Sequence, residues 1–225
     1  MPPQTIVQLQ EKIDRDLAWR KKEIVAILRA TARVSASKQY YCRAGVVMLC
    51  AHWEGFLKKA VGLYVKFVFS QELKYTEMSD HFVAISFYDD VVEAAKANYP
   101  GARQHHLKLS KKIRDATTGP ARWKVGTHGN PSSEVLSCLM ESIGIDGQLN
   151  MSAAEWVAAK TFVDSLLLAE RHKIAHGEGL QVDSDVFRER VTIVLSLCQA
   201  ISDAILAAAQ SESYRVACQE PGVAA

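Results

Sequence analysis

Residues 40–68 read YYCRAGVVMLCAHWEGFLKKAVGLYVKFV, and this stretch decides the fold class of the chain. Its large apolar side chains recur at steps of three and four residues, which places them along one side of an α-helix. The stretch also holds few residues that break a helix. We therefore predict a helix over residues 37–71, with an apolar stripe made of Val46, Leu49, Trp53, Leu57, Ala60, Tyr64, Phe67 and Val68.

The same period continues on both sides of this helix. Towards the N-terminus, isoleucines and leucines between positions 6 and 28 predict a long helix over residues 4–32. Towards the C-terminus, a helix that begins near Asp183 or Asp185 carries a stripe at steps of four and three, made of Phe187, Val191, Val194, Cys198, Ile201 and Ile205. These stripes indicate helices that bury one side in a common core.

Capping residues predict two further helices. Ser132 or Ser133 can cap a helix that Gly144 ends. Ser152 and Glu155 have the spacing of a capping box. The helix that they open runs up to Gly177, a natural residue just past a helix C-terminus. Its apolar side consists of Trp156, Phe162, Val163, Leu166, Leu167 and Ile174.

Residues 73–131 differ from the rest, because prolines and glycines interrupt them repeatedly. We predict short helices over 88–97 and 103–116 joined by loops, while HFVAISFY at 81–88 leaves helix and strand open. The predicted fold class is all-α, an antiparallel helical bundle with a helical and loop elaboration in its middle. We expect a single domain over 1–225, with core helices over about 4–71 and 132–214.

Composition narrows the classes of function. A net charge of +2 over 225 residues gives no general argument for a nucleic-acid or membrane partner. The five cysteines contain no CxxC pair, so neither a zinc site nor a disulfide framework is indicated. The polar N-terminus lacks the apolar region of a signal peptide, and no apolar run approaches a membrane span in length. We expect a cytoplasmic protein without membrane contact, metal or cofactor.

The stretch LLLAERHKIAHGEG at 166–179 carries the candidate chemistry, with Arg171 and His176 spaced as R-x4-H. Residues five apart on a regular helix point about 140° apart, with a rise of about 7.5 Å. Arg171 and His176 can therefore meet only if the helix ends or bends between them, or if two chains share one site. Gly177 leaves the first possibility open, because it places His176 in the last turn.

Arginine and histidine together suit the cleavage of a phosphodiester bond by the 2′-hydroxyl of RNA. An arginine guanidinium binds phosphate with two hydrogen bonds and balances its developing charge. A histidine can transfer protons near neutral pH. The alternative is purely structural, because the helix dipole by itself favours positive side chains in a last turn.

The string ERHKIAHGEG resembles the R-x4-6-H motif of the HEPN superfamily, whose helical domains often act as RNases. It is most similar to a bacterial branch with the string R-N-x-I-A-H-G-E. The branch's A-H-W-E-G-F-x-K string is matched by AHWEGFLK at 51–58, and residues 129–146 resemble its segment before the motif helix. The resemblance covers most of the chain, and residues 73–128 match least securely.

This resemblance implies a four-helix core, a homodimer with a composite site, and metal-independent cleavage of an RNA substrate. Arg171 and His176 carry over as catalytic residues. His172 stands where the branch commonly has asparagine, so its role stays open between binding phosphate, sharing proton transfer and capping the helix. An acidic residue such as Glu54 can face the site in this family, with a structural or surface glutamate as the alternative.

Many members of the superfamily are toxins or anti-phage effectors held in check by a partner protein. We therefore expect a possible antitoxin or regulatory protein as a second partner. Other members have lost catalysis and bind only nucleotides or proteins. A non-catalytic helical module is accordingly the alternative function.

Residues 102–124 are strongly basic, with seven lysines and arginines against one aspartate, or 7 − 1 = +6. A track for the RNA backbone could include Lys108, Lys111, Lys112 and Arg114, with Trp123 stacking on a base. The alternative is a solvated helix face that turns its leucines and Ile113 inward. His105 and His106 lack a matching set of metal ligands.

Overall fold

The computed structural model describes residues 2–31, 38–97, 101–115 and 123–216. Across these ranges the chain forms helices and no strand, and one isolated antiparallel bridge joins Met78 to Arg215. The all-α prediction is confirmed. The elements are α1 (Ile6–Thr31), α2 (Lys38–Phe69), η1 (Tyr75–Glu77), α3 (Asp80–Lys96), α4 (Gly101–Asp115), α5 (Ser133–Ser142), α6 (Ala153–Lys160), η2 (Thr161–Leu168), α7 (Ala169–Ala175) and α8 (Ser184–Gln210).

Helix α2 is the centre of the molecule, because α1, α8, α7, η2 and α5 all pack against it. All eight side chains of its predicted apolar stripe are buried. Trp53 is fully buried, and its indole Nε1 donates a 2.8 Å hydrogen bond to the Pro131 carbonyl. The segment before α5 is thereby attached to the middle of α2.

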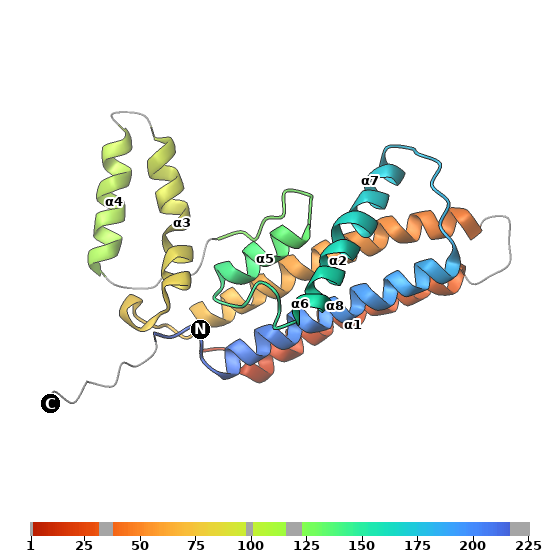
Figure 1. Ribbon diagram of the computed structural model, residues 1–225. Helices are drawn as coiled ribbons and strands as arrows, with labels where there is room; N and C mark the ends of the chain where they lie inside the picture. The colour runs from red at the N-terminus through yellow and green to blue at the C-terminus, as the bar shows by residue number, and fades with distance from the viewer. Residues whose placement is uncertain (1, 32–37, 98–100, 116–122, 217–225) are drawn as a thin grey trace.

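The long helices run side by side, with α1 antiparallel to both α2 and α8 (Figure 1). The six predicted apolar residues of α8 are all buried. Within the described ranges, α8 alone combines the length and hydropathy that a membrane span needs, but 50% of that window is buried inside the bundle. A core helix in a protein of this size has the same character.

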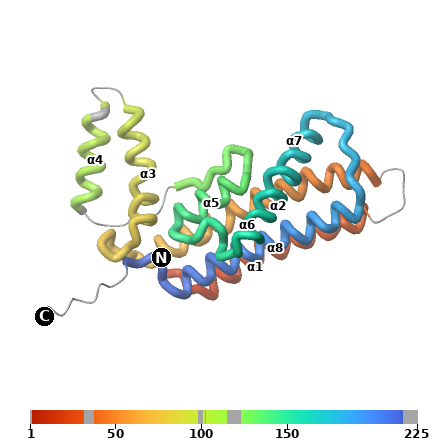
Figure 2. Tube along the Cα trace, in the orientation of Figure 1, coloured from red at the N-terminus to blue at the C-terminus, as the bar shows by residue number. Residues whose placement is uncertain are grey.

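Helices α3 and α4 pair as a hairpin that projects from one end of the bundle (Figures 1 and 2). The ambiguous stretch 81–88 belongs to α3, which begins at Asp80 rather than near residue 88. Phe82 is fully buried here, with its ring edge-on to Tyr64 and Phe69 of α2. Since Phe82 and Ile85 lie three positions apart on the buried side, this stretch has helical and not alternating periodicity.

The predicted helix over 152–176 runs without a break, but its middle part is wound as a π-helix instead of an α-helix. The capping box of Ser152 and Glu155 opens α6, as expected, and residues 161–168 then form a π-helix before α7 begins. A π-helical turn takes in one more residue than an α-helical turn. Buried Phe162 and Leu167 are therefore five positions apart, while Leu166 is 42% exposed, contrary to the predicted apolar side.

Asp164 of η2 binds the start of α5. Its carboxylate accepts hydrogen bonds from the Ser133 backbone N–H at 2.8 Å and from the Ser133 hydroxyl at 2.5 Å. Ser132 is the N-cap of α5, with its hydroxyl oxygen accepting from the N–H of Val135. The two serines thus have separate roles, because Ser132 caps the helix while Ser133 attaches it to η2.

Gly45 allows α2, α8 and α1 to approach closely. A Cβ atom at this position would lie 2.5 Å from Cζ of Phe187 and 3.1 Å from Cγ2 of Ile27. We expect Gly45→Ala to lower the free energy of unfolding by about 1–3 kcal/mol, because the buried Phe187 ring must move. Thermal unfolding monitored by circular dichroism measures the loss.

Gly62→Ala is the matched control, since it is the same change inside the same helix. The nearest atom to a Cβ at Gly62 is 3.9 Å away, which is an ordinary contact. Alanine should therefore stabilise the helix there by about 0.5–1 kcal/mol. Equal effects at the two glycines would contradict the close packing of Phe187 against Gly45.

Candidate active site at the end of α7

The end of α7 is a regular C-terminal cap built on Gly177. His176 is the cap residue, and Gly177 adopts the left-handed conformation with φ +83°. The backbone N–H of Glu178 bonds to the Lys173 carbonyl at 3.0 Å, and that of Gly177 to the Ile174 carbonyl at 3.1 Å. This pair of bonds is a Schellman motif. The predicted role of Gly177 is confirmed, and His176 is fixed at the point where the helix stops.

His172 and His176 lie against each other on the exposed side of this last turn. Their ring centroids are 4.2 Å apart, with an angle of 55° between the ring planes. Both residues are exposed, and within the described ranges neither imidazole is engaged in a hydrogen bond or ion pair. Two imidazoles are therefore available to solvent within one turn of helix.

Arg171 lies on the side of α7 that faces α2. It is partly buried, and its positive charge acts on the Cys50 thiol. Burial raises the pKa of Cys50 to about 11, and Arg171 opposes that rise. No carboxylate among the described residues forms an ion pair with the Arg171 guanidinium, so it is available to an anion from outside.

Glu54 lies one helical turn beyond Cys50 on α2. Its Oε1 accepts a 2.5 Å hydrogen bond from the hydroxyl of buried Thr127 and lies 3.6 Å from Nζ of Lys58. Glu54 is thus hydrogen-bonded to the 123–131 segment and forms an ion pair within its own helix. It is close enough to act electrostatically on Cys50, and its hydrogen bond and ion pair within the described ranges go to Thr127 and Lys58 rather than to Arg171 or the two histidines.

His52, two residues before Glu54, points to the other side of α2. It is 4% exposed, with Nε2 3.1 Å from the Glu23 carboxylate and its ring edge-on to Trp19. Gly55 lies nearby, where a Cβ would be 2.5 Å from Nη1 of Arg20. The Arg20 guanidinium in turn is paired with Asp16 at 2.6 Å. His52 and Gly55 therefore belong to the packing of α1 on α2.

The neighbour of Arg171 attaches α7 to the bundle. Glu170 forms a two-point ion pair with Arg190 of α8, in which Nη2 of Arg190 donates to Oε1 of Glu170 at 2.6 Å. Both side chains are largely buried. Burial raises the pKa of Glu170, and the charge and hydrogen bonds of Arg190 oppose this rise. The pair could not be predicted from local sequence, because 20 positions separate its members.

The loop that follows His176 is bound to the start of α2. Arg43 donates a 2.9 Å hydrogen bond from Nη2 to the Glu178 carbonyl, and Gln39 accepts one from the Val182 N–H at 3.1 Å. The exit from α7 is therefore held on both sides, by the ion pair to α8 and by this loop. Such fixed elements position side chains more accurately than a free loop can.

Two lysines of the predicted basic track on α4 form ion pairs with α3. Lys112 bonds to Asp90 of α3 at 2.5 Å, and Lys108 lies 3.7 Å from the same carboxylate. Lys111 and Arg114 are exposed. His105 lies 3.7 Å from Glu93, and within the described ranges no three metal-binding side chains gather together. Trp123 shares a pocket with Lys58, Lys59 and Lys66 of α2, which are not among the predicted RNA-binding residues.

Gly177→Ala should lower stability at the end of α7, because an L-residue with φ +83° costs about 1–2 kcal/mol. The melting temperature should fall by about 2–8 °C for a chain of this size. Gly179→Ala is the control, since a Cβ there meets no atom within 4 Å and its φ is not positive. Equal losses at both glycines would mean that the cap does not determine the end of α7.

Comparison with known proteins gives a single result. A family model described as RiboL-PSP-HEPN matches residues 15–207, a span from α1 to α8 that includes Glu54, Arg171 and His176. Neither the curated proteins nor the solved structures contain a match to the chain.

Proposed function

Because the chain belongs to the RiboL-PSP-HEPN family of the HEPN superfamily, we propose that it is an endoribonuclease that cleaves RNA without a metal ion. HEPN domains are compatible with RNase and nucleotide-related roles. The observation that carries the proposal is the end of α7, where Arg171 has no carboxylate partner among the described residues and two neighbouring imidazoles face solvent.

The residues fit cleavage by the 2′-hydroxyl of the substrate. The 2′ oxygen attacks the adjacent phosphorus while the bond from phosphorus to the 5′ oxygen breaks, which yields a 2′,3′-cyclic phosphate and a 5′-hydroxyl. Arg171 binds the phosphate and balances the charge that develops on it. One imidazole accepts the proton of the 2′-hydroxyl, and another donates a proton to the leaving oxygen. His176 and His172, or His176 from a second copy, would divide these roles.

A homodimer would complete the site. In one chain Arg171 faces α2 while His172 and His176 face solvent. Two copies related by a two-fold axis that brings the ends of α7 together would supply two arginines and four histidines to one cleft. We further propose that the protein acts as a toxin or anti-phage effector, restrained by a partner protein, in the cytoplasm.

The test is incubation of the purified protein with single-stranded RNA in EDTA. We expect cleavage to persist and the products to carry 2′,3′-cyclic phosphate ends. Products with 3′-hydroxyl ends, or activity that EDTA removes, would overturn the mechanism. The competing function is a non-catalytic module that binds a protein or nucleotide. It would be supported if expression were harmless to cells and no RNA were cut.

A further inference from the structure

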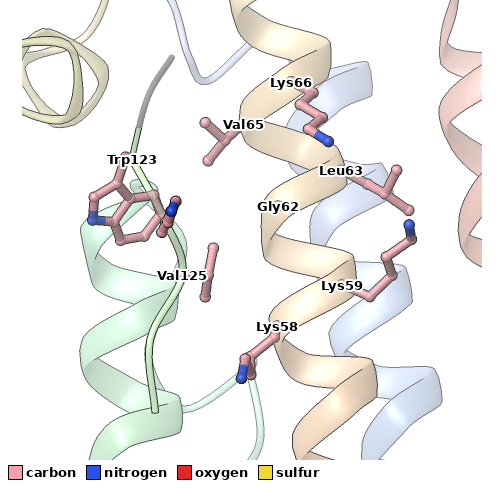
Figure 3. A pocket seen from close by; sticks show the side chains of 9 residues that line it. Lys58, Lys59, Gly62, Leu63, Val65, Lys66, Trp123 and Val125 are labelled. Atoms are coloured by element: carbon pink, nitrogen blue, oxygen red, sulfur yellow. The ribbon is translucent and has the colours of Figure 1, made fainter. Parts of the chain in front are cut away.

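A cavity of about 390 Å³ lies between α2 and the segment before α5. Lys58, Lys59 and Lys66 of α2 line one side, and Trp123 and Lys124 line the other. Figure 3 shows the Trp123 ring facing α2 on one side of the helix, while the Lys59 and Lys66 side chains extend on its other side. The apolar part of the lining consists of Gly62, Leu63 and Val65 of α2 together with Val125.

A second cavity of about 460 Å³ continues the first on the α1 side of α2. Lys12, Arg15 and Trp19 of α1 line it. Lys59, Leu63 and Lys66 line both cavities, so the two form one surface that crosses α2. We call this surface the basic groove.

The basic groove has a strong excess of positive charge. Six cations line it, namely Lys12, Arg15, Lys58, Lys59, Lys66 and Lys124. Its one acidic residue, Asp16, is paired with Arg20. Among the described residues, Lys58 alone of the six has a carboxylate neighbour, Glu54 at 3.6 Å. This concentration of charge on a chain with a net charge of only +2 attracts a polyanion.

Aromatic side chains stand at both ends of the groove. Trp19 is 48% exposed, with the Arg20 guanidinium 4.7 Å from its ring centroid. Trp123 is partly buried and packs against the core. The exposed Trp19 ring beside the cations of the groove favours a nucleic acid over an acidic peptide, because an unpaired base can stack on it.

The groove and the candidate active site lie along the same helix, α2. Cys50, Glu54 and Lys58 occupy successive turns, so Lys58 lies about 12 Å along the helix from the thiol that Arg171 faces. A single strand bound at Arg171 would therefore reach Lys58 within a few nucleotides. Lys66 lies about 12 Å further along the same helix.

We infer that the basic groove binds the backbone of single-stranded RNA beyond the cleavage point, as a substrate-binding surface separate from the reacting residues. This inference rests on the proposed function for its ligand class. Lys59 and Lys66, which line both halves of the groove about 10.5 Å apart along α2, contact two phosphates of the same strand. Trp123 supports a base.

The experiment measures binding and not cleavage. Fluorescence anisotropy of a labelled single-stranded oligoribonucleotide is recorded with His176→Ala protein, which keeps the RNA intact, in EDTA and at several salt concentrations. Adding Lys59→Gln and Lys66→Gln should weaken binding about tenfold and reduce the slope of log Kd against log salt by about 1.4, or about 0.7 per phosphate contact. Glutamine preserves helix propensity at both exposed positions.

The matched control adds Lys96→Gln and Lys160→Gln, two exposed lysines on α3 and α6 outside both the groove and the basic track on α4. The control should retain the parent affinity and salt slope. Equal weakening in both pairs would overturn the proposal, since binding would then follow net charge alone. Equally tight binding of poly-glutamate in the groove would also overturn it and indicate an acidic protein partner. If the protein binds the oligoribonucleotide as expected but cleaves no RNA, the proposed function is overturned while RNA binding by the basic groove is not.

Discussion

Replacing either Arg171 or His176 with alanine should abolish RNA cleavage in EDTA and leave the fold intact. Loss of a proton-transferring imidazole lowers kcat by about 10²–10⁴-fold. Loss of a group that binds the developing charge costs about 10²–10³-fold. Neither side chain is fully buried, and neither is hydrogen-bonded within the described ranges, so stability should change by less than about 0.5 kcal/mol. Initial rates of oligonucleotide cleavage and thermal melts measure the two effects.

Lys173→Ala is the matched control for these variants, because it removes an exposed cation from the same turn. Its cleavage rate should stay close to that of the parent protein. A parent-like rate in Arg171→Ala or His176→Ala would remove the end of α7 from the mechanism. His172→Ala separates the roles left open for that residue, since a lowered kcat would indicate proton transfer and a raised KM would indicate phosphate binding.

Mixing the two inactive variants tests whether two copies share a site. If each site takes Arg171 from one copy and His176 from the other, half of the dimers in an equal mixture contain one intact site. Activity should then return to about a quarter of the parent value. No recovery after exchange of subunits would mean that Arg171 and His176 of a working site come from the same copy. The same result would follow if each cleft needed Arg171 and His176 from both copies.

Replacing Arg190 with methionine should cause the largest loss of stability. It would leave the Glu170 carboxylate largely buried without its two-point partner, which costs about 3–5 kcal/mol. The melting temperature should fall by about 6–20 °C for a chain of this size. Cleavage should also weaken, because Glu170 attaches the helix that carries Arg171.

The double variant Glu170→Leu with Arg190→Met tests this explanation. It removes both charges, so it should recover most of the stability that the single variant loses. Lowering the pH should do the same in Arg190→Met alone. Burial raises the pKa of Glu170 because it favours the neutral form of the carboxyl group. Protonation at lower pH therefore removes the unpaired buried charge and restores stability. The deficit relative to the parent should therefore shrink as the pH falls from 7 to about 4.5. A deficit independent of both changes would mean that Arg190 acts only by packing.

The sequence predicted the elements that depend on local pattern. The stripes of α2 and α8, the capping box at Ser152 and the cap at Gly177 are each set by residues within a few positions of one another. The start of α3 was not predicted, because HFVAISFY is too short to separate helix from strand, and the burial of Phe82 against Tyr64 and Phe69 of α2 is a long-range contact. Membership of the HEPN superfamily, expected from three motifs, is supported over residues 15–207.

Long-range pairing could not be predicted in the same way. Nothing in the sequence near Glu170 points to Arg190, and nothing near Glu54 points to Thr127. The basic groove was missed for a similar reason, since its cations come from α1, α2 and the segment before α5. The dense run of positive charge on α4 was predicted to bind RNA, whereas Lys108 and Lys112 of that run form ion pairs with Asp90 of α3. How the site is shared between copies remains a prediction.

The π-helical winding at 161–168 has a consequence for how related chains should be compared. Each π turn takes up one residue more than an α turn, so this segment holds an extra residue without lengthening the path to Arg171. A chain one residue shorter here could wind as an ordinary α-helix and still present its arginine to α2. Alignments of relatives should therefore place one-residue gaps between Phe162 and Leu167, with the spacing from the arginine to the histidine unaffected.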